Sequence, residues 1–167
     1  MANQYPDAPL NHFDETEHRR LIASRANAIA YELGEITPTL SFATVGDLSN
    51  AYGTQAGKYW RHGTLVHFSI DLVVTPTFTT ASGIAEVGGL PYVATAGFPS
   101  SFFAVRLSGA NVTWPAGMTT VIGTIAPSEA LIKLEFQGSV SAGVNLLAAD
   151  ITSANALTIR ATGFYPI

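Results

Sequence analysis

The chain has 167 residues, a formal net charge of −4, and charged side chains at only 12% of its positions, about half the share of a typical soluble domain. An acidic chain without a Lys/Arg cluster argues against nucleic acid as a partner, and the lack of cysteine excludes a disulfide framework or a cysteine metal site. No apolar run reaches the roughly 20 residues of a membrane-spanning helix, so we expect no membrane insertion.

The charged residues are unevenly distributed. Nine lie within residues 1–35 and eleven within residues 36–167. Because a small domain on its own needs a charged surface to stay in solution, the second segment indicates a β domain whose faces are buried against copies of itself. The alternative is a monomer whose surface is coated with Thr, Ser and Asn.

Residues 1–13 contain Pro6 and Pro9 and almost no periodicity, which predicts an extended arm. This segment lacks the apolar core of a secretory signal. A chain without cysteine can fold in a reducing bacterial cytoplasm, where we expect it to be made.

Residues 14–33 have the pattern of one helix. Asp14 is a suitable N-cap, with Glu17 three residues later, and Gly34 is a natural terminator. Apolar side chains follow the 4-3-4 spacing of a coiled-coil seam, at Ile22, Ala26, Ile29 and Leu33. We expect residues 14–35 to form a short self-associating stalk; the alternative is a helix packed on its own β domain.

Residues 36–167 carry β signals. Residues 64–75 alternate, with Val66, Phe68, Ile70 and Leu72 on one face, and follow residues 55–61 across a His62-Gly63 turn. Further strands are expected at 39–43, 83–87, 102–107, 119–125, 131–137 and 155–164. The predicted fold is mainly β: an antiparallel, jelly-roll-like β-sandwich preceded by one N-terminal α-helix.

Several short motifs occur in a fixed order. They are His18-Arg19-Arg20, Thr37-Pro38-Thr39-Leu40-Ser41-Phe42, a hairpin from Gly57-Lys58-Tyr59 to Gly63-Thr64-Leu65-Val66, Gly89-Leu90-Pro91-Tyr92, and Ile159-Arg160-Ala161-Thr162-Gly163-Phe164-Tyr165. As an ordered set covering most of residues 18–167, they resemble the C-terminal β domains of bacteriophage tail fibres and receptor-binding proteins.

The resemblance implies a homotrimer in the phage virion that binds the host surface, at a glycan or an outer-membrane component. The stalk is then a trimeric coiled coil, residues 36–167 are a tip domain, and residues 1–13 attach to another virion protein. Three equivalent weak sites would gain affinity through avidity. The chain is very short for a whole fibre, which leaves open a head-fibre or capsid decoration protein with no receptor role, and a glycan-degrading tail-tip hydrolase.

Catalytic patterns are weak. His67, Ser69 and Asp71 share one strand face, but neighbouring members are about 6.5–7 Å apart along a strand, too far for a triad. The carboxylates of the β region are scattered singly, at Asp47, Asp71, Glu86, Glu129, Glu135 and Asp150. We therefore expect a protein that is not an enzyme and that needs no metal and no cofactor.

Aromatic side chains near predicted turns are the best ligand candidates, because sugar rings stack on aromatic rings and binding surfaces are enriched in Trp and Tyr. The candidate ligand-binding residues are Trp60, Tyr92, Phe98, Asn111 and Trp114. For each aromatic residue, the alternative is ordinary packing in the core or in a trimer.

Overall fold

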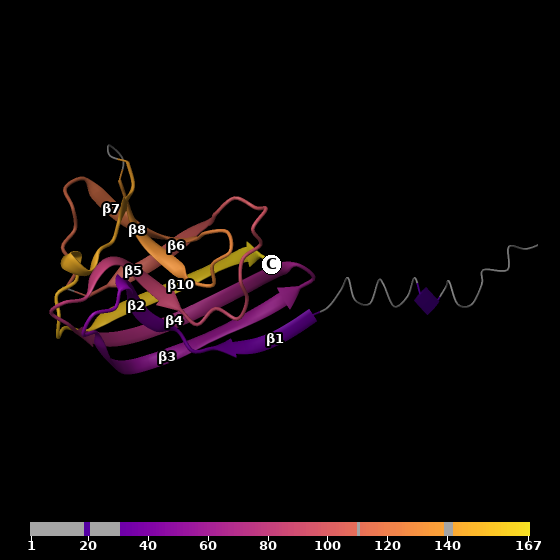
Figure 1. Cartoon of the computed structure of the whole chain (residues 1–167), viewed down its shortest axis with the longest axis horizontal. Helices are drawn as coiled ribbons and strands as arrows, with labels where there is room; N and C mark the ends of the chain where they lie inside the picture. The colour runs from indigo at the N-terminus through magenta and orange to yellow at the C-terminus, as the bar shows by residue number, and fades with distance from the viewer. Residues whose placement is uncertain (1–18, 21–30, 110, 139–141) are drawn as a thin grey trace, which may run out of the picture.

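The computed structural model describes residues 19–20, 31–109, 111–138 and 142–167 (Figure 1). In these ranges the structure is almost wholly antiparallel β, apart from helical Arg19 and Arg20 and one short 3-10 helix, η1. The elements are β1 (Tyr31–Ile36), β2 (Thr39–Thr44), β3 (Ser49–His62), β4 (Leu65–Thr77), β5 (Ser82–Gly88), β6 (Ser101–Ser108), β7 (Met118–Ile125), β8 (Ile132–Gly138), β9 (Val144–Asn145), η1 (Ala148–Asp150) and β10 (Leu157–Pro166).

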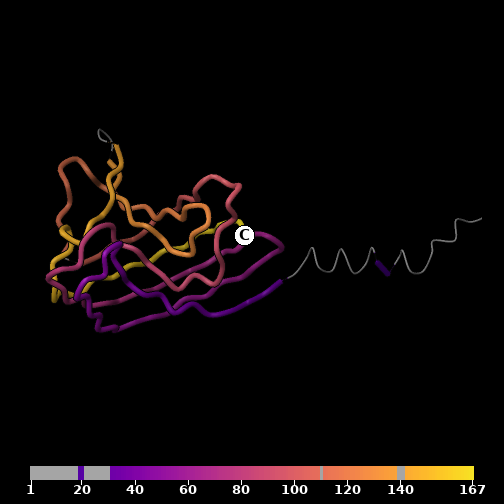
Figure 2. Tube along the Cα trace, in the orientation of Figure 1, coloured from indigo at the N-terminus to yellow at the C-terminus, as the bar shows by residue number. Residues whose placement is uncertain are grey.

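The described strands form one continuous sheet in the order β1-β3-β4-β10-β6-β7-β8-β5-β2, with β9 beside β8. The sheet curls into two layers (Figures 1 and 2). We call β1, β3, β4 and β10 the continuous wing, and the remaining strands the short-strand wing. The predicted antiparallel, mainly β fold is confirmed, but the two expected layers are parts of one curled sheet.

The two wings are joined through β10 and β6. β10 pairs with β4 along its whole length, but with β6 only at Thr158–Ala161. β6 in turn pairs with β7 only through its first half, as far as Val105 opposite Val121. Since β6 has β7 as its neighbour at one end and β10 at the other, the sheet bends at Val105 and leaves gaps on both sides of the bend.

The core consists of the inward faces of both wings. In β4, the side chains of Val66, Phe68, Ile70 and Leu72 are at most 4% exposed, which confirms the predicted alternation. Tyr165 of β10 is also fully buried, and its hydroxyl donates to the Tyr92 carbonyl oxygen at 3.1 Å. Burial raises the pKa of Tyr165 to about 12.

Six further predicted strands are confirmed, with ends shifted by at most two residues. They were predicted at 39–43, 83–87, 102–107, 119–125, 131–137 and 155–164, and they correspond in this order to β2, β5, β6, β7, β8 and β10. The His62-Gly63 hairpin is also confirmed, with Gly63 at φ 59°. β3 begins at Ser49, earlier than predicted, because an irregularity between Tyr52 and Thr54 breaks the alternation without ending the pairing with β4.

The prediction for residues 31–35 is wrong. They were expected to complete the stalk helix, with Gly34 as its terminator and Leu33 in the seam, but they lie in β1. β1 pairs with β3 from Tyr31 opposite His62 to Ile36 opposite Gly57, so the sheet begins before the expected boundary at residue 36. Of the predicted helix, Ile22, Ala26 and Ile29 lie outside the described residues, as does the arm at 1–13.

Pairing with β3 explains why residues 31–36 form a strand. Gly34 lies opposite Tyr59, whose ring crosses the position that a Cβ of residue 34 would occupy. Ile36, which lies on the same face of β1 as Gly34, is buried, whereas Leu33 faces outward. Gly34 therefore serves close packing within the sheet, not the end of a helix.

Candidate ligand-binding groove

The outer face of the continuous wing carries a row of large side chains from four strands. The register places Leu33 of β1, Trp60 of β3, His67 of β4 and Phe164 of β10 side by side. The Trp60 and His67 rings stack, with centroids 5.4 Å apart and planes 4° apart, and the His67 and Phe164 ring centroids are 5.7 Å apart. Leu33 and Phe164 remain 65% and 56% exposed.

Two polar rows follow on the same face. The first consists of Glu35, Lys58, Ser69 and Thr162, and the second of Ala56, Asp71 and Arg160. The Thr162 hydroxyl donates to Ser69 Oγ at 3.2 Å, and Arg160 Nε donates to Asp71 Oδ1 at 3.0 Å. These contacts connect β4 to β10 across the face.

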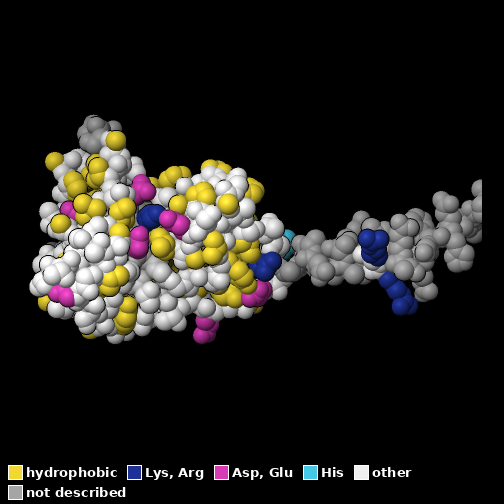
Figure 3. Space-filling view, viewed as in Figure 1, with side chains coloured by type: hydrophobic (Ala, Val, Ile, Leu, Met, Phe, Trp, Pro, Cys, Tyr) yellow, Lys and Arg dark blue, Asp and Glu magenta, His cyan; other side chains and the backbone are white. Residues whose placement is uncertain are grey.

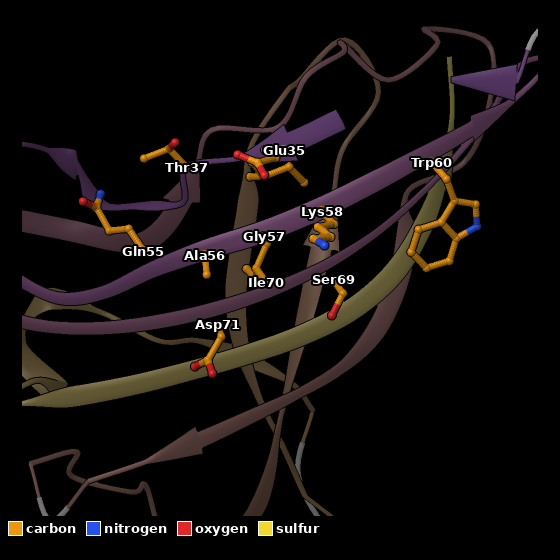
Figure 4. A pocket seen from close by; sticks show the side chains of 11 residues that line it. Glu35, Thr37, Gln55, Ala56, Gly57, Lys58, Trp60, Ser69, Ile70 and Asp71 are labelled. Atoms are coloured by element: carbon orange, nitrogen blue, oxygen red, sulfur yellow. The ribbon is translucent and has the colours of Figure 1, made fainter. Parts of the chain in front are cut away.

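A groove of about 480 Å³ lies over these rows, beside the end of β1. It is open because β1 ends at Ile36, and because Ala56, Gly57 and Ser69 are small. Figure 4 shows the Trp60 ring at one end of the groove, with Lys58 and Ser69 between it and Asp71. The groove thus has an aromatic ring at one end and several polar side chains within a largely apolar lining.

This arrangement suits a saccharide. A sugar ring can stack its apolar face on an aromatic ring, and carboxylates, hydroxyls and an ammonium group can hydrogen-bond to its hydroxyl groups. The groove volume lies within the usual range for small-molecule sites. The side chains that supply these groups are those of Trp60, Glu35, Lys58, Ser69 and Asp71.

His67, Ser69 and Asp71 do share one face of β4, as predicted, but each has a different partner. His67 stacks on Trp60, Ser69 accepts from Thr162, and Asp71 pairs with Arg160. These contacts belong to the cross-strand rows and provide none of the hydrogen bonds of a catalytic triad.

Glu32 joins β1 to the loop that precedes β6. Its two carboxylate oxygens accept from the Tyr59 hydroxyl at 2.7 Å and the Tyr92 hydroxyl at 2.6 Å. The Arg61 guanidinium lies 5.3 Å from the centre of the Tyr92 ring. The hydrogen bonds from Tyr59 and then Tyr92 lower the pKa of Glu32, and the bond to Glu32 raises the pKa of Tyr59. We call Glu32, Tyr59, Arg61 and Tyr92 the Glu32 cluster.

The five predicted ligand-binding residues lie in different places. Trp60 lines the groove, whereas Tyr92 belongs to the Glu32 cluster. Phe98 is 55% exposed and lines a separate hollow with Phe102 and Phe164. Asn111 donates its side-chain amide to the Ala156 carbonyl oxygen, and so supports a loop.

Trp114 lies in the loop between β6 and β7. Its ring packs against Phe136, with centroids 5.0 Å apart, and lines a hollow between those two strands. Each of the three hollows described here is lined by one of the five predicted residues: Trp60, Phe98 or Trp114.

The carboxylates of the β region mostly have structural partners. Asp47 accepts from the backbone and hydroxyls of Thr79 and Thr80, which holds its pKa well below the usual range, with the Thr79 hydroxyl bond as the largest cause. Glu129 pairs with Lys133 at 2.6 Å, and Glu135 accepts from the Thr124 hydroxyl. These contacts stabilise loops and strand pairs.

Glu35 and Lys58 were missed as groove residues. Residue 35 was assigned to the end of a helix, so its place beside β3 had no signal in the sequence. The alternation of residues 55–61 placed Lys58 and Trp60 on one face, but only the register with β1 and β4 shows what lies next to them.

The chain matches no protein-family model and no curated protein. It is similar in structure to the crystal structure of the Dettilon tailspike protein (gp208), with a TM-score of 0.59 and 17% sequence identity. The match covers 81% of this chain and 24% of the tailspike chain, so this chain spans about a quarter of that protein's length. The likeness shows a shared fold.

Two further observations concern the described residues only. No helix among them has the length and apolarity needed to cross a membrane. No group of three or more of their His, Asp and Glu side chains is arranged to hold a metal ion.

Proposed function

We propose that the chain is an adhesin of a bacteriophage tail, a receptor-binding module that holds a host-surface glycan in the Trp60 groove. The groove carries the proposal, because an aromatic ring beside carboxylate, hydroxyl and ammonium groups suits saccharide binding. The tailspike fold supports a place on the virion tail, and the ordered motifs of tail-fibre tip domains support the same role.

We further propose that the protein acts as a homotrimer, with residues 1–13 attached to another virion protein. Charged side chains are few on the face shown in Figure 3, where acidic side chains gather around one Lys or Arg side chain. Tyr31 and Leu33 of β1 are 62% and 65% exposed. Apolar side chains on an edge strand favour burial against another copy. Three grooves in one particle would raise the affinity for a repetitive surface glycan.

Competition with phage for host cells tests the adhesin role. The purified protein is expected to block adsorption, and Trp60→Ala to weaken this block about tenfold or more. Tyr52→Ala is the matched control, because Tyr52 is an exposed aromatic residue at the other end of β3. Equal blocking by wild type and Trp60→Ala would contradict the groove assignment, and no blocking by wild type would favour a decoration protein.

Light scattering tests the trimer. A native mass near three times 17.6 kDa is expected, and Ile29→Asp should reduce it by placing charge in the proposed stalk seam. A monomeric wild type would contradict the trimer.

Release of reducing sugar ends from host polysaccharide would instead favour the alternative of a glycan hydrolase.

A further inference from the structure

A second hollow lies where β6 and β7 separate. The two strands pair from Ser101 opposite Ile125 to Val105 opposite Val121 and no further, although both remain extended beyond that point. The hollow of about 450 Å³ between them is lined by Arg106 and Leu107 on one side and by Thr119 and Thr120 on the other, with Trp114 beside them. Because no ladder closes this gap, the facing backbone edges are open to a ligand or to water.

The loop that carries Trp114 is held at several points. Thr113 N donates to the Asp150 carbonyl oxygen at 2.8 Å, and Thr152 N donates to the Asn111 carbonyl oxygen at 2.7 Å. At the end of the loop, Met118 N donates to the Pro115 carbonyl oxygen at 3.1 Å. Trp114 itself rests on Phe136 and is still 39% exposed. The ring is therefore positioned before any ligand arrives.

The charges beside this hollow are unbalanced. Arg106 lies directly opposite Arg160 in the β6–β10 ladder, and like charges in such positions repel. Asp71 offsets part of the Arg160 charge through the 3.0 Å contact. Within the part of the chain that the structure describes, Arg106 forms no ion pair, and its side chain is exposed. One positive charge is left at the edge of the hollow.

We propose that the β6–β7 hollow binds an acidic sugar residue, with Arg106 on its carboxylate or phosphate, Trp114 against its ring, and Thr120 near its hydroxyl groups. A guanidinium group matches both anions through two parallel hydrogen bonds. An anion beside Arg106 would also relieve the repulsion from Arg160. The inference rests on the proposed function and extends it, because it gives the chemical class of the glycan.

The chain has two tryptophans, which permits a direct binding measurement. In Trp60→Phe, Trp114 is the only tryptophan, so its fluorescence reports on the β6–β7 hollow. Titration with glucuronic acid or glucose 6-phosphate is expected to give a saturable change that salt weakens, whereas glucose gives none. Glucuronic acid carries a carboxylate and glucose 6-phosphate carries a phosphate, so a comparison of the two shows which anion the hollow binds.

Adding Arg106→Gln to Trp60→Phe should weaken acid binding at least about tenfold, while Arg106→Lys should restore part of it. Lys133→Gln in the same background is the matched control, since it removes one positive charge of the same wing outside the hollow. Arg106→Gln should not lower the melting temperature, because it removes a like-charge contact. No saturable change with either acid, equal binding of glucose, or unchanged binding in Arg106→Gln would overturn the inference.

These outcomes are separable from those of the adhesin test. If wild type blocks adsorption and Trp60→Ala does not, but Arg106→Gln binds both acids normally, the inference fails and the proposed function stands. If the acids bind through Arg106 but the protein never blocks adsorption, the inference stands and the proposed function fails.

Discussion

The continuous wing and the short-strand wing differ in how regularly their strands pair. β3 and β4 pair from Ser49 opposite Thr77 to His62 opposite Leu65, with one irregularity. In the other wing, β6 and β7 separate after Val105, and β5 and β8 share two residue pairs, Glu86–Lys133 and Val87–Ile132. Long ladders align side chains in rows, whereas short ladders leave openings between strands.

The two candidate sites follow from this difference. The Trp60 groove lies over the paired strands β3 and β4 beside the end of β1, where small residues leave room between larger ones. The Arg106–Trp114 hollow lies within the sheet, where two strands part. One curled sheet thus has two kinds of candidate binding surface, and the following predictions test whether the wings depend on each other.

The largest effect is expected from Phe68→Ala in the continuous wing. Phe68 is fully buried, and its ring packs edge-on against Phe103 of the other wing at 5.1 Å between centroids. The cavity should reduce the free energy of unfolding by about 4 kcal/mol. Chemical denaturation measures the loss; a loss below about 1 kcal/mol would mean that the core between the wings is wrongly described.

Leu134→Ala in β8 is the counterpart in the short-strand wing. Leu134 is fully buried, and we expect a loss of about 3 kcal/mol in the free energy of unfolding. Because the wings share one core, both variants should keep a single unfolding transition. Two separate transitions by fluorescence and circular dichroism would show that the wings unfold independently.

A smaller effect is expected from Glu32→Gln, which weakens the connection of β1 to the rest of the continuous wing. The folded-state pKa of Glu32 lies below the usual 4.5, so its charge stabilises the protein above about pH 4.5, and this stabilisation is lost as the pH falls through the lowered pKa. Glu32→Gln should lower the melting temperature at neutral pH, with a difference from wild type that shrinks in acid. A difference that stays constant with pH would argue against the two tyrosine contacts.

The smallest effect is expected from Thr162→Val on the outer face. This change removes the hydroxyl that donates to Ser69 Oγ, a contact exposed to solvent. The expected loss in the free energy of unfolding is below about 1 kcal/mol. A larger loss would mean that the polar rows stabilise the sheet, and are less available to a ligand than we infer.

Prediction from sequence succeeded where the determining contacts are local. The alternation of Val66, Phe68, Ile70 and Leu72 and the turn at His62-Gly63 were enough to find β4 and its hairpin with β3. It failed at residues 31–35, because Leu33 and Gly34 fit the last turn of a helix as well as a strand, and the pairing with β3 that decides between them is not visible in the sequence. Gly34 and Leu33 were assigned to a helix for that reason.

The candidate site was found only in part. Trp60 was predicted as a ligand residue on the grounds of its type and its place near a turn, and it does line the groove. Its neighbours Asp71 and Glu35 come from two other strands, and their proximity depends on strand register. Arg106 and Trp114 line one hollow because β6 and β7 stop pairing, and no sequence pattern marked that point.

By itself, the sequence determined the mainly β class, most strand positions, and the low share of charged side chains. These properties follow from composition, turn residues and a two-residue period, all of which act over short stretches of chain. The tertiary structure decided the strand identity of residues 31–36, the joining of the wings through β10, and both candidate sites. Those features depend on pairing between segments as distant as β4 and β10, and the register of such pairs is set by packing of the whole core.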